Sequence, residues 1–136
     1  FSSNYSLYGD ISQRVMEILL GFSPDVEIYS IDEAFLNFKG FKKHELLTYC
    51  KHIRRTIKQW VGIPVSIGVG STKTLSKIAN HLAKKYEDYQ GVCILKSGKK
   101  TEEVLNKIEI GMIDITIFPI ENSSIGKICN ILCMNK

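Results

Sequence analysis

The sequence has few of the features that mark membrane, disulfide-rich or zinc-binding proteins. It contains no long apolar run and no signal-peptide pattern, so nothing in it predicts a membrane span. The four cysteines include one close pair, spaced C-x-x-x-C, and no second pair: Cys50, Cys93, Cys129 and Cys133. This spacing argues against a disulfide framework and a structural zinc site, so we expect reduced thiols in a cytoplasmic protein.

A strong charge of either sign is also absent. The net charge is +4 over 136 residues, which permits an anionic partner without requiring one. Repeats and low-complexity segments are missing as well. Hydrophobic residues make up 44% of the chain, with six Phe, six Tyr and one Trp. This supply is sufficient for the core of one compact domain with a small appendage.

The most informative feature present is a pair of adjacent acids, Asp32-Glu33, inside the apolar run 28–38. Two neighbouring carboxylates repel each other and are costly to bury, so they usually need a cation. No His or Cys lies close by in the sequence, and an oxygen-only pair suits Mg²⁺, which is held by one or two carboxylates together with substrate phosphates. The pair therefore indicates phosphoryl-transfer chemistry.

An alternative interpretation is that Asp32-Glu33 is a solvated hairpin tip. Acids are common at turns, and two residues between two strand-like runs is an ordinary hairpin spacing. Against this interpretation, neither residue is the Gly or Asn that tight hairpin turns prefer, and the flanking residues are unusually apolar. The dipeptide alone leaves both interpretations open.

Hydrophobic periodicity predicts seven elements in the order helix, strand, strand, helix, strand, helix, strand. The first helix ends at Gly21, two strands span 26–31 and 34–38, a second helix spans 42–60, a strand spans 64–70, a third helix reaches Ala83, and a strand spans 91–95. In the second helix the apolar positions are Leu46, Cys50, Ile53, Ile57 and Trp60. Its cations Lys51, Arg54, Arg55 and Lys58 are interpreted as a solvated face. The order predicts an α+β, split βαβ or ferredoxin-like domain that lacks its first strand.

A glycine-rich segment, 68–74, precedes the third helix. It is no P-loop, because the G-x-x-x-x-G-K-[ST] spacing is absent. A helix beginning near Ser71 or Thr72 still favours an anion at its free N–H groups, although capping alone explains both residues. Four basic residues then follow at i, i+4, i+8 and i+11: Lys73, Lys77, His81 and Lys84. Such a stripe is able to contact phosphates, but a solvated helix face has the same pattern.

Three segments carry a resemblance to a known family. Residues 29–35 read Tyr-Ser-Ile-Asp-Glu-Ala-Phe, residues 64–70 read Pro-Val-Ser-Ile-Gly-Val-Gly, and residues 73–79 read Lys-Thr-Leu-Ser-Lys-Ile-Ala. Together with the opening segment 1–8, they resemble the palm of the Y-family, translesion DNA polymerases, over about residues 1–95. The resemblance implies a ferredoxin-like palm with an antiparallel or mixed sheet and helices on one face.

The resemblance also implies a chemistry, error-prone two-metal nucleotidyl transfer in DNA repair and the SOS response. Asp32 and Glu33 would be the catalytic, Mg²⁺-binding pair, Lys77 would contact the incoming triphosphate, and Lys73 would support phosphate or DNA contacts. The implied partners are primer-template DNA and a deoxynucleoside triphosphate. For a full-length parent they would include accessory SOS proteins and a sliding clamp, and no membrane.

The sequence departs from the family pattern at both ends. Another metal-binding Asp of the family would lie before Phe1, so we expect negligible polymerase activity from this chain alone. After a linker at 96–101, we expect residues 102–136 to be a truncated thumb. Its helix-hairpin-helix-like segment, 119–127, is one residue short and has Ser124 where the first glycine belongs. The isoleucine-rich segment 108–117 remains open between a strand, a distorted helix and an exposed stretch.

Two other functions stay open at this point. The first is a catalytically dead remnant that binds only DNA or another protein. The second is a different palm-fold nucleotidyl enzyme such as a nucleotide cyclase, which the segment Ser30-Ile31-Asp32-Glu33 makes distant.

Overall fold

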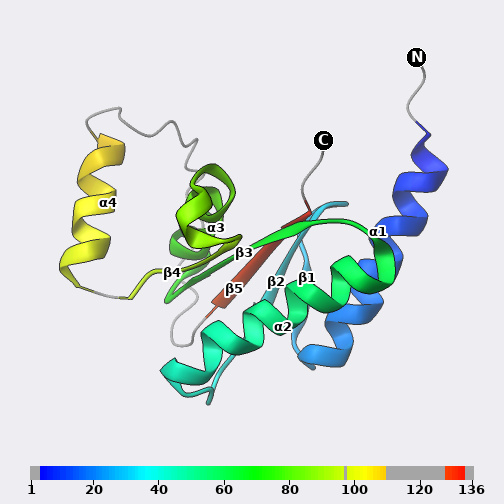
Figure 1. The fold of residues 1–136 in the computed structure, drawn as a ribbon, viewed down its shortest axis with the longest axis horizontal. Coiled ribbons are helices and arrows are strands. Elements are labelled where there is room, and N and C mark those ends of the chain that lie inside the picture. Colours follow the sequence, from blue (N-terminus) through cyan, green and yellow to red (C-terminus); the bar gives the residue numbers. More distant parts are fainter. Residues whose placement is uncertain (1–3, 97, 110–127, 134–136) are drawn as a thin grey trace.

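The computed structural model describes residues 4–96, 98–109 and 128–133 (Figure 1). All seven predicted elements form within a few residues of their expected bounds. The complete order is α1 Tyr5–Phe22, β1 Val26–Ile28, β2 Glu33–Asn37, α2 Lys43–Val61, β3 Val65–Gly70, α3 Lys73–Lys85, a 3₁₀ turn Glu87–Tyr89, β4 Val92–Ile94, α4 Lys99–Glu109 and β5 Ile128–Cys133. The predicted α+β class is confirmed.

The strands form one mixed sheet in the order β1-β2-β5-β3-β4. Strand β5 lies antiparallel between β2 and β3, β1 is antiparallel to β2, and β3 is parallel to β4. The expectation of an open position in the sheet is therefore wrong for the described strands, because β5 pairs with β2 along one side and with β3 along the other.

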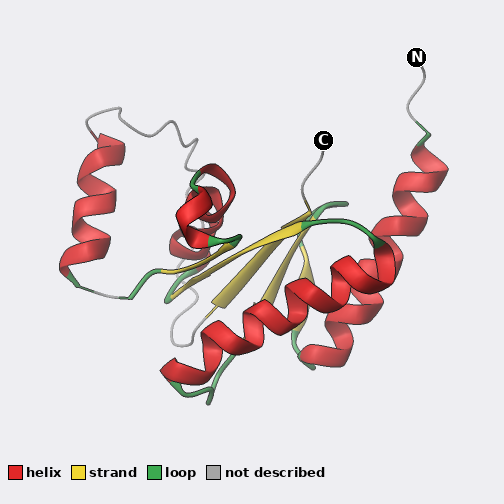
Figure 2. Ribbon diagram, viewed as in Figure 1, coloured by secondary structure: helices red, strands yellow, loops and turns green. Residues whose placement is uncertain are grey.

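Helices α1 and α2 cover one face of the sheet, and the larger core lies beneath them (Figure 2). Four of the five apolar positions predicted for α2 are buried: Leu46, Cys50, Ile53 and Ile57. They pack with alternate residues of the strands, such as Leu36 of β2 and Ile67 of β3. Trp60 differs from the prediction, since it is 71% exposed in the last turn of α2.

Helix α3 packs on the opposite face of the sheet, so the expectation of helices on one face is wrong in this detail. The reason lies in β3, where Val65, Ile67 and Val69 face the larger core, while Gly68 and Gly70 face α3. A Cβ atom built on Gly68 would lie 2.1 Å from the backbone nitrogen of Asn80, and one on Gly70 would lie 2.6 Å from that of Ser76. Helix and strand backbones are thus in direct contact.

A buried polar contact fixes the same helix along the strand. The Ser66 hydroxyl lies 2.6 Å from Oδ1 of Asn80, and Nδ2 of Asn80 donates to the Ser66 carbonyl at 3.1 Å. Both residues are almost fully buried. Because each polar atom has a partner, the contact sets the register of α3 on β3 without leaving an unsatisfied group.

Three described elements are absent from the sequence prediction, and one of them is the 3₁₀ turn Glu87–Tyr89. Helix α4 begins at Lys99, within the stretch predicted as a linker, and β5 lies within the predicted thumb segment. The helix-hairpin-helix-like segment 119–127 and most of the isoleucine-rich segment fall outside the described residues. The division at residues 95 and 102 stays a prediction. No helix in the described part of the chain has the length and apolar character needed to cross a membrane.

We predict that Gly68→Ala destabilises the fold, because its Cβ would overlap the backbone of α3. Overpacking of this kind costs about 3 kcal/mol of unfolding free energy, which urea denaturation measures. Gly9→Ala is the matched control. Nothing lies within 4 Å of a Cβ at Gly9 in helix α1, so alanine there should stabilise by about 0.5–1 kcal/mol. Equal effects of the two substitutions would contradict direct helix–strand contact.

Candidate nucleotide and metal site

The two acids lie at the bend that joins β1 to β2, as predicted. The backbone N–H groups of Tyr29 and Ser30 both donate to the Glu33 carbonyl at 3.0 Å, and the Ser30 hydroxyl donates to Oδ1 of Asp32 at 2.7 Å. Glu33 is only 8% exposed. A solvated hairpin tip is therefore the wrong description for Glu33, whereas Asp32 is half-buried.

Glu33 meets Lys77, as expected for a buried carboxylate that needs a cation. The Lys77 Nζ lies 3.3 Å from Oε1 of Glu33 and 4.5 Å from the centre of the Tyr29 ring. The Glu33 side chain is 11% exposed and the Lys77 side chain 32%. In this partly desolvated position the ammonium balances the carboxylate, and the aromatic face adds a favourable cation–π contact.

Lys73 lies one helical turn before Lys77 and has a similar environment. Its Nζ is 2.5 Å from Oε2 of Glu27 on β1 and 5.3 Å from the Phe35 ring centre on β2. The rings of Tyr29 and Phe35 pack edge to face with centroids 5.5 Å apart. Two aromatic rings thus lie beside the two lysines at the β1–β2 ribbon.

The position of the first turn of α3 places these lysines beside the acids. Thr72 caps the helix by accepting from the Leu75 N–H at 3.2 Å, and the two glycines of β3 bring the helix against the sheet. Of the four predicted site residues, Glu33 and Lys77 are in direct contact. Lys73 lies one helical turn away against Glu27, and Asp32 precedes Glu33 at the bend, where it accepts from Ser30. The other two residues of the basic stripe differ in exposure, since Lys84 is exposed and His81 is half-buried.

Sequence reasoning missed three contributors to this arrangement: Glu27, Tyr29 and Phe35. Hairpin pairing offered a signal for two of them, because Glu27 and Phe35 are directly opposite in the β1–β2 register. No local sequence pattern indicated that these residues contact the lysines. They depend on where α3 sits relative to β1 and β2, which follows only from the tertiary packing.

The carboxylates at the bend fit a divalent metal in their chemistry. They offer hard oxygen donors on adjacent residues, which suits Mg²⁺. Within residues 4–96, 98–109 and 128–133 no group of three His, Cys, Asp or Glu side chains is placed to hold a metal ion. Asp32 and Glu33 would therefore need phosphate or water oxygens to complete a coordination shell.

A family model described as the impB/mucB/samB family matches residues 1–81. The chain belongs to this family. Its relatives include UmuC of Salmonella typhimurium, 48% identical over 88 residues, which cover 64% of this chain and 21% of UmuC. ImpB of Salmonella typhimurium is 42% identical over 96 residues, covering 70% of this chain and 23% of ImpB.

A protein named as a DNA polymerase is also similar to this chain. DNA polymerase IV of Moorella thermoacetica is 37% identical over 82 residues, which cover 59% of this chain and 20% of that protein. The resemblance to Y-family polymerases in the sequence analysis is thus confirmed. The chain spans about a fifth of the length of these relatives.

We predict that Glu33 and Lys77 are energetically coupled. Lys77→Met leaves a buried carboxylate without its ammonium and should cost about 2 kcal/mol of unfolding free energy, part of which Glu33→Gln should restore in the double variant. A double-mutant cycle by urea denaturation should give a coupling near 1 kcal/mol. The control is the exposed pair Asp10–Arg14, 3.0 Å apart on α1, with an expected coupling of about 0.3–0.5 kcal/mol. Equal couplings would contradict a desolvated pair.

We also predict an acid-side loss of stability from His81. Burial, followed by the nearby Lys85 and Lys84 charges, lowers the pKa of His81 below 6.5. Below pH 6.5 the unfolded chain therefore binds a proton that the folded chain resists, and stability falls until the pH passes the lowered folded pKa. Melting temperatures measured between about pH 7.5 and pH 5 should fall less steeply in His81→Gln than in the wild type. Parallel curves would contradict this.

Proposed function

We propose that this chain supplies part of the palm of a translesion DNA polymerase, with Asp32 and Glu33 as metal-binding carboxylates and Lys77 as the triphosphate contact. The single observation that carries the proposal is the contact of the buried Glu33 with the half-buried Lys77 at 3.3 Å, in a chain of the impB/mucB/samB family. Anionic and cationic groups in contact at one bend suit a ligand that has both divalent cations and phosphates, such as magnesium-bound deoxynucleoside triphosphate.

In this proposal the chain's own residues bind and orient the nucleotide. Divalent cations, when bound, supply charge neutralisation at the phosphates and activation of the primer hydroxyl. Asp32 and Glu33 hold them, and the Ser30 hydroxyl, 2.7 Å from Oδ1 of Asp32, orients that carboxylate. Glu33 would hold such a cation in place of its contact with Lys77, and the Lys77 ammonium would then be able to contact a phosphate oxygen.

Lys73 supports phosphate or primer-template DNA contacts in the same proposal. It lies one turn from Lys77 and is held by Glu27 on the edge strand. Helix α3 thus places two lysines beside the carboxylates of the β1–β2 ribbon. Accessory SOS proteins and a sliding clamp stay predictions from the family resemblance and concern the longer relatives.

A second candidate function is a module that binds DNA or a protein without catalysis. One specific observation favours it, because the described residues provide two adjacent carboxylates at the bend and no group of three metal-binding side chains. Two-metal chemistry depends on holding both ions in fixed geometry. We therefore expect negligible primer extension by this chain alone, while nucleotide binding at the bend should persist.

We predict that the chain binds deoxyadenosine triphosphate only with Mg²⁺, and that Lys77→Gln weakens this binding about 10- to 100-fold, the value of one charged hydrogen bond. Isothermal titration calorimetry measures it. Lys84→Gln, an exposed lysine on the same helix, is the matched control and should bind as the wild type does. Asp32→Asn should weaken the Mg²⁺ dependence.

The outcomes separate the two candidates. Binding that is lost in Lys77→Gln, with no primer extension, supports a nucleotide site that is catalytically incomplete in this chain. No binding by the folded wild type in Mg²⁺ removes the nucleotide site. Primer extension that Asp32→Ala abolishes would contradict the expectation of inactivity and establish a complete polymerase site.

A further inference from the structure

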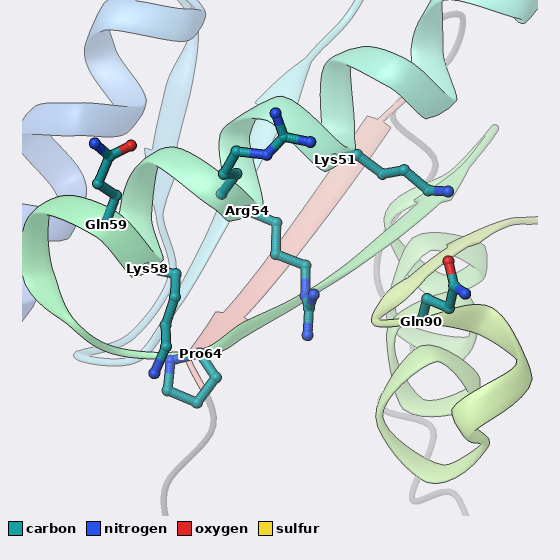
Figure 3. A pocket seen from close by; sticks show the side chains of 7 residues that line it. Lys51, Arg54, Lys58, Gln59, Pro64 and Gln90 are labelled. Atoms are coloured by element: carbon teal, nitrogen blue, oxygen red, sulfur yellow. The ribbon is translucent and has the colours of Figure 1, made fainter.

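A cationic surface lies on the other side of the sheet from the candidate site. A hollow of about 500 Å³ opens along the C-terminal half of α2 (Figure 3). Its lining residues are Lys51, Arg54, Arg55, Lys58, Gln59, Pro64 and Gln90. Helix α2 covers the face of the sheet opposite to α3, so this basic hollow is separate from Lys73 and Lys77.

The described residues that line the basic hollow have charges of one sign only. Four of these seven residues are cations, two are amides, and none is a carboxylate. Within the described residues, neither Lys51 nor Arg55 has an ion pair or hydrogen bond through its side chain. Asp88 and Lys51 both line an adjoining hollow, but they form no ion pair. Among the described residues, no carboxylate pairs with Lys51 or Arg55.

Arg54 is held in place by contacts on two sides. Its Nε donates to the Val65 carbonyl at 2.8 Å, and its guanidinium lies against Gly91, where a Cβ atom would be 2.3 Å from Nε. Gly91 also has a φ of +80°, so glycine suits this position for both space and conformation. Figure 3 shows Arg54 extending from α2 toward β3 between Lys51 and Lys58. A fixed guanidinium loses little conformational entropy on meeting a ligand.

The spacing of the cations suits a chain of phosphates. Lys51 and Lys58 are seven residues apart on one helix, which at about 1.5 Å per residue is roughly 10 Å. Successive phosphates of one DNA strand advance about 3.4 Å along a duplex, so this length spans about three of them. Arg and Lys are the usual phosphate-binding side chains, and the amides of Gln59 and Gln90 are further donors.

We propose that the basic hollow binds the phosphate backbone of a nucleic-acid strand, outside the candidate nucleotide site. An acidic protein segment has a similar charge, but protein interfaces usually bury aromatic or large aliphatic anchors at their centre. Among the described lining residues, Pro64 alone is apolar. The chemistry of the hollow is thus that of phosphate contacts, which are electrostatic and salt-dependent.

The test measures binding of a fluorescently labelled single-stranded oligonucleotide to the whole chain by anisotropy, with EDTA present to keep divalent cations from the candidate site. Lys51→Gln/Arg55→Gln removes two exposed cations from the hollow. Lys39→Gln/Lys42→Gln removes two exposed cations elsewhere and is the charge-matched control. Thermal unfolding of both double variants verifies that they fold.

We expect the hollow variant to bind about tenfold or more weakly at low salt, and the slope of log K against log salt to decrease by about 1.4, the value for two single-strand phosphate contacts. The control variant should change the affinity and the salt slope little. In a Lys77→Gln background, the hollow substitutions should still lower the salt slope by the same amount. This comparison separates the proposal from the nucleotide site, because binding at one site does not require binding at the other.

Three results would overturn the proposal. Equal weakening by the hollow and control pairs would mean that net charge alone attracts the oligonucleotide. Displacement by a polyglutamate peptide as effective as that by unlabelled oligonucleotide would assign the hollow to an acidic protein segment. Complete displacement by millimolar inorganic phosphate would assign it to free phosphate rather than to a strand.

Discussion

The direct contact of α3 with β3 is the constraint on which the candidate site depends. Gly68 and Gly70 have no side chains, so the helix backbone lies against the strand backbone, and the Ser66–Asn80 hydrogen bonds set how far along the strand it sits. A helix held away by ordinary side chains would be displaced by several ångströms. Lys77 would then be out of hydrogen-bonding distance of Glu33. The glycine-rich segment thus allows close packing of α3 on β3, and this packing positions Lys77 at the site.

The Glu33–Lys77 pair follows from that placement and from the cost of burying charge. Glu33 begins β2 with little exposure, and a carboxylate in that position is unfavourable without a cation. In the described structure an ammonium meets this need. A divalent cation would meet it equally well, so lysine and metal are alternative partners of one carboxylate. The same electrostatic demand therefore links the stability of the fold to the proposed binding of a nucleotide.

The sequence allowed much of this arrangement to be predicted, because the signals were local. Periods of 3.6 and 2 residues located the helices and strands, and the apolar flanks of Asp32-Glu33 indicated an unusual pair of acids. What could not be predicted depended on contacts between distant segments. The short apolar run of β5 fits a strand or a helix equally well, and its place between β2 and β3 depends on pairing along two separate edges. The Lys73–Glu27 contact likewise requires α3 and β1 to be placed first.

The cations of α2 illustrate why a residue pattern alone is ambiguous between solvation and binding. On the helix surface, Lys51, Arg54, Arg55 and Lys58 form an ordinary basic face, and the sequence favours solvation for each of them. The structure distinguishes these cations by their contacts. Arg54 is fixed by Val65 and Gly91, while Arg55 and Lys51 extend from α2 without a described partner. A cation that only faces solvent needs no fixed position, so the fixed Arg54 favours ligand binding over solvation. Lys73 and Lys77 of α3 lie on the opposite face and are paired with acids. The sheet thus separates them from the basic face of α2, and one phosphate-bearing ligand would reach both only by passing around the edge of the sheet.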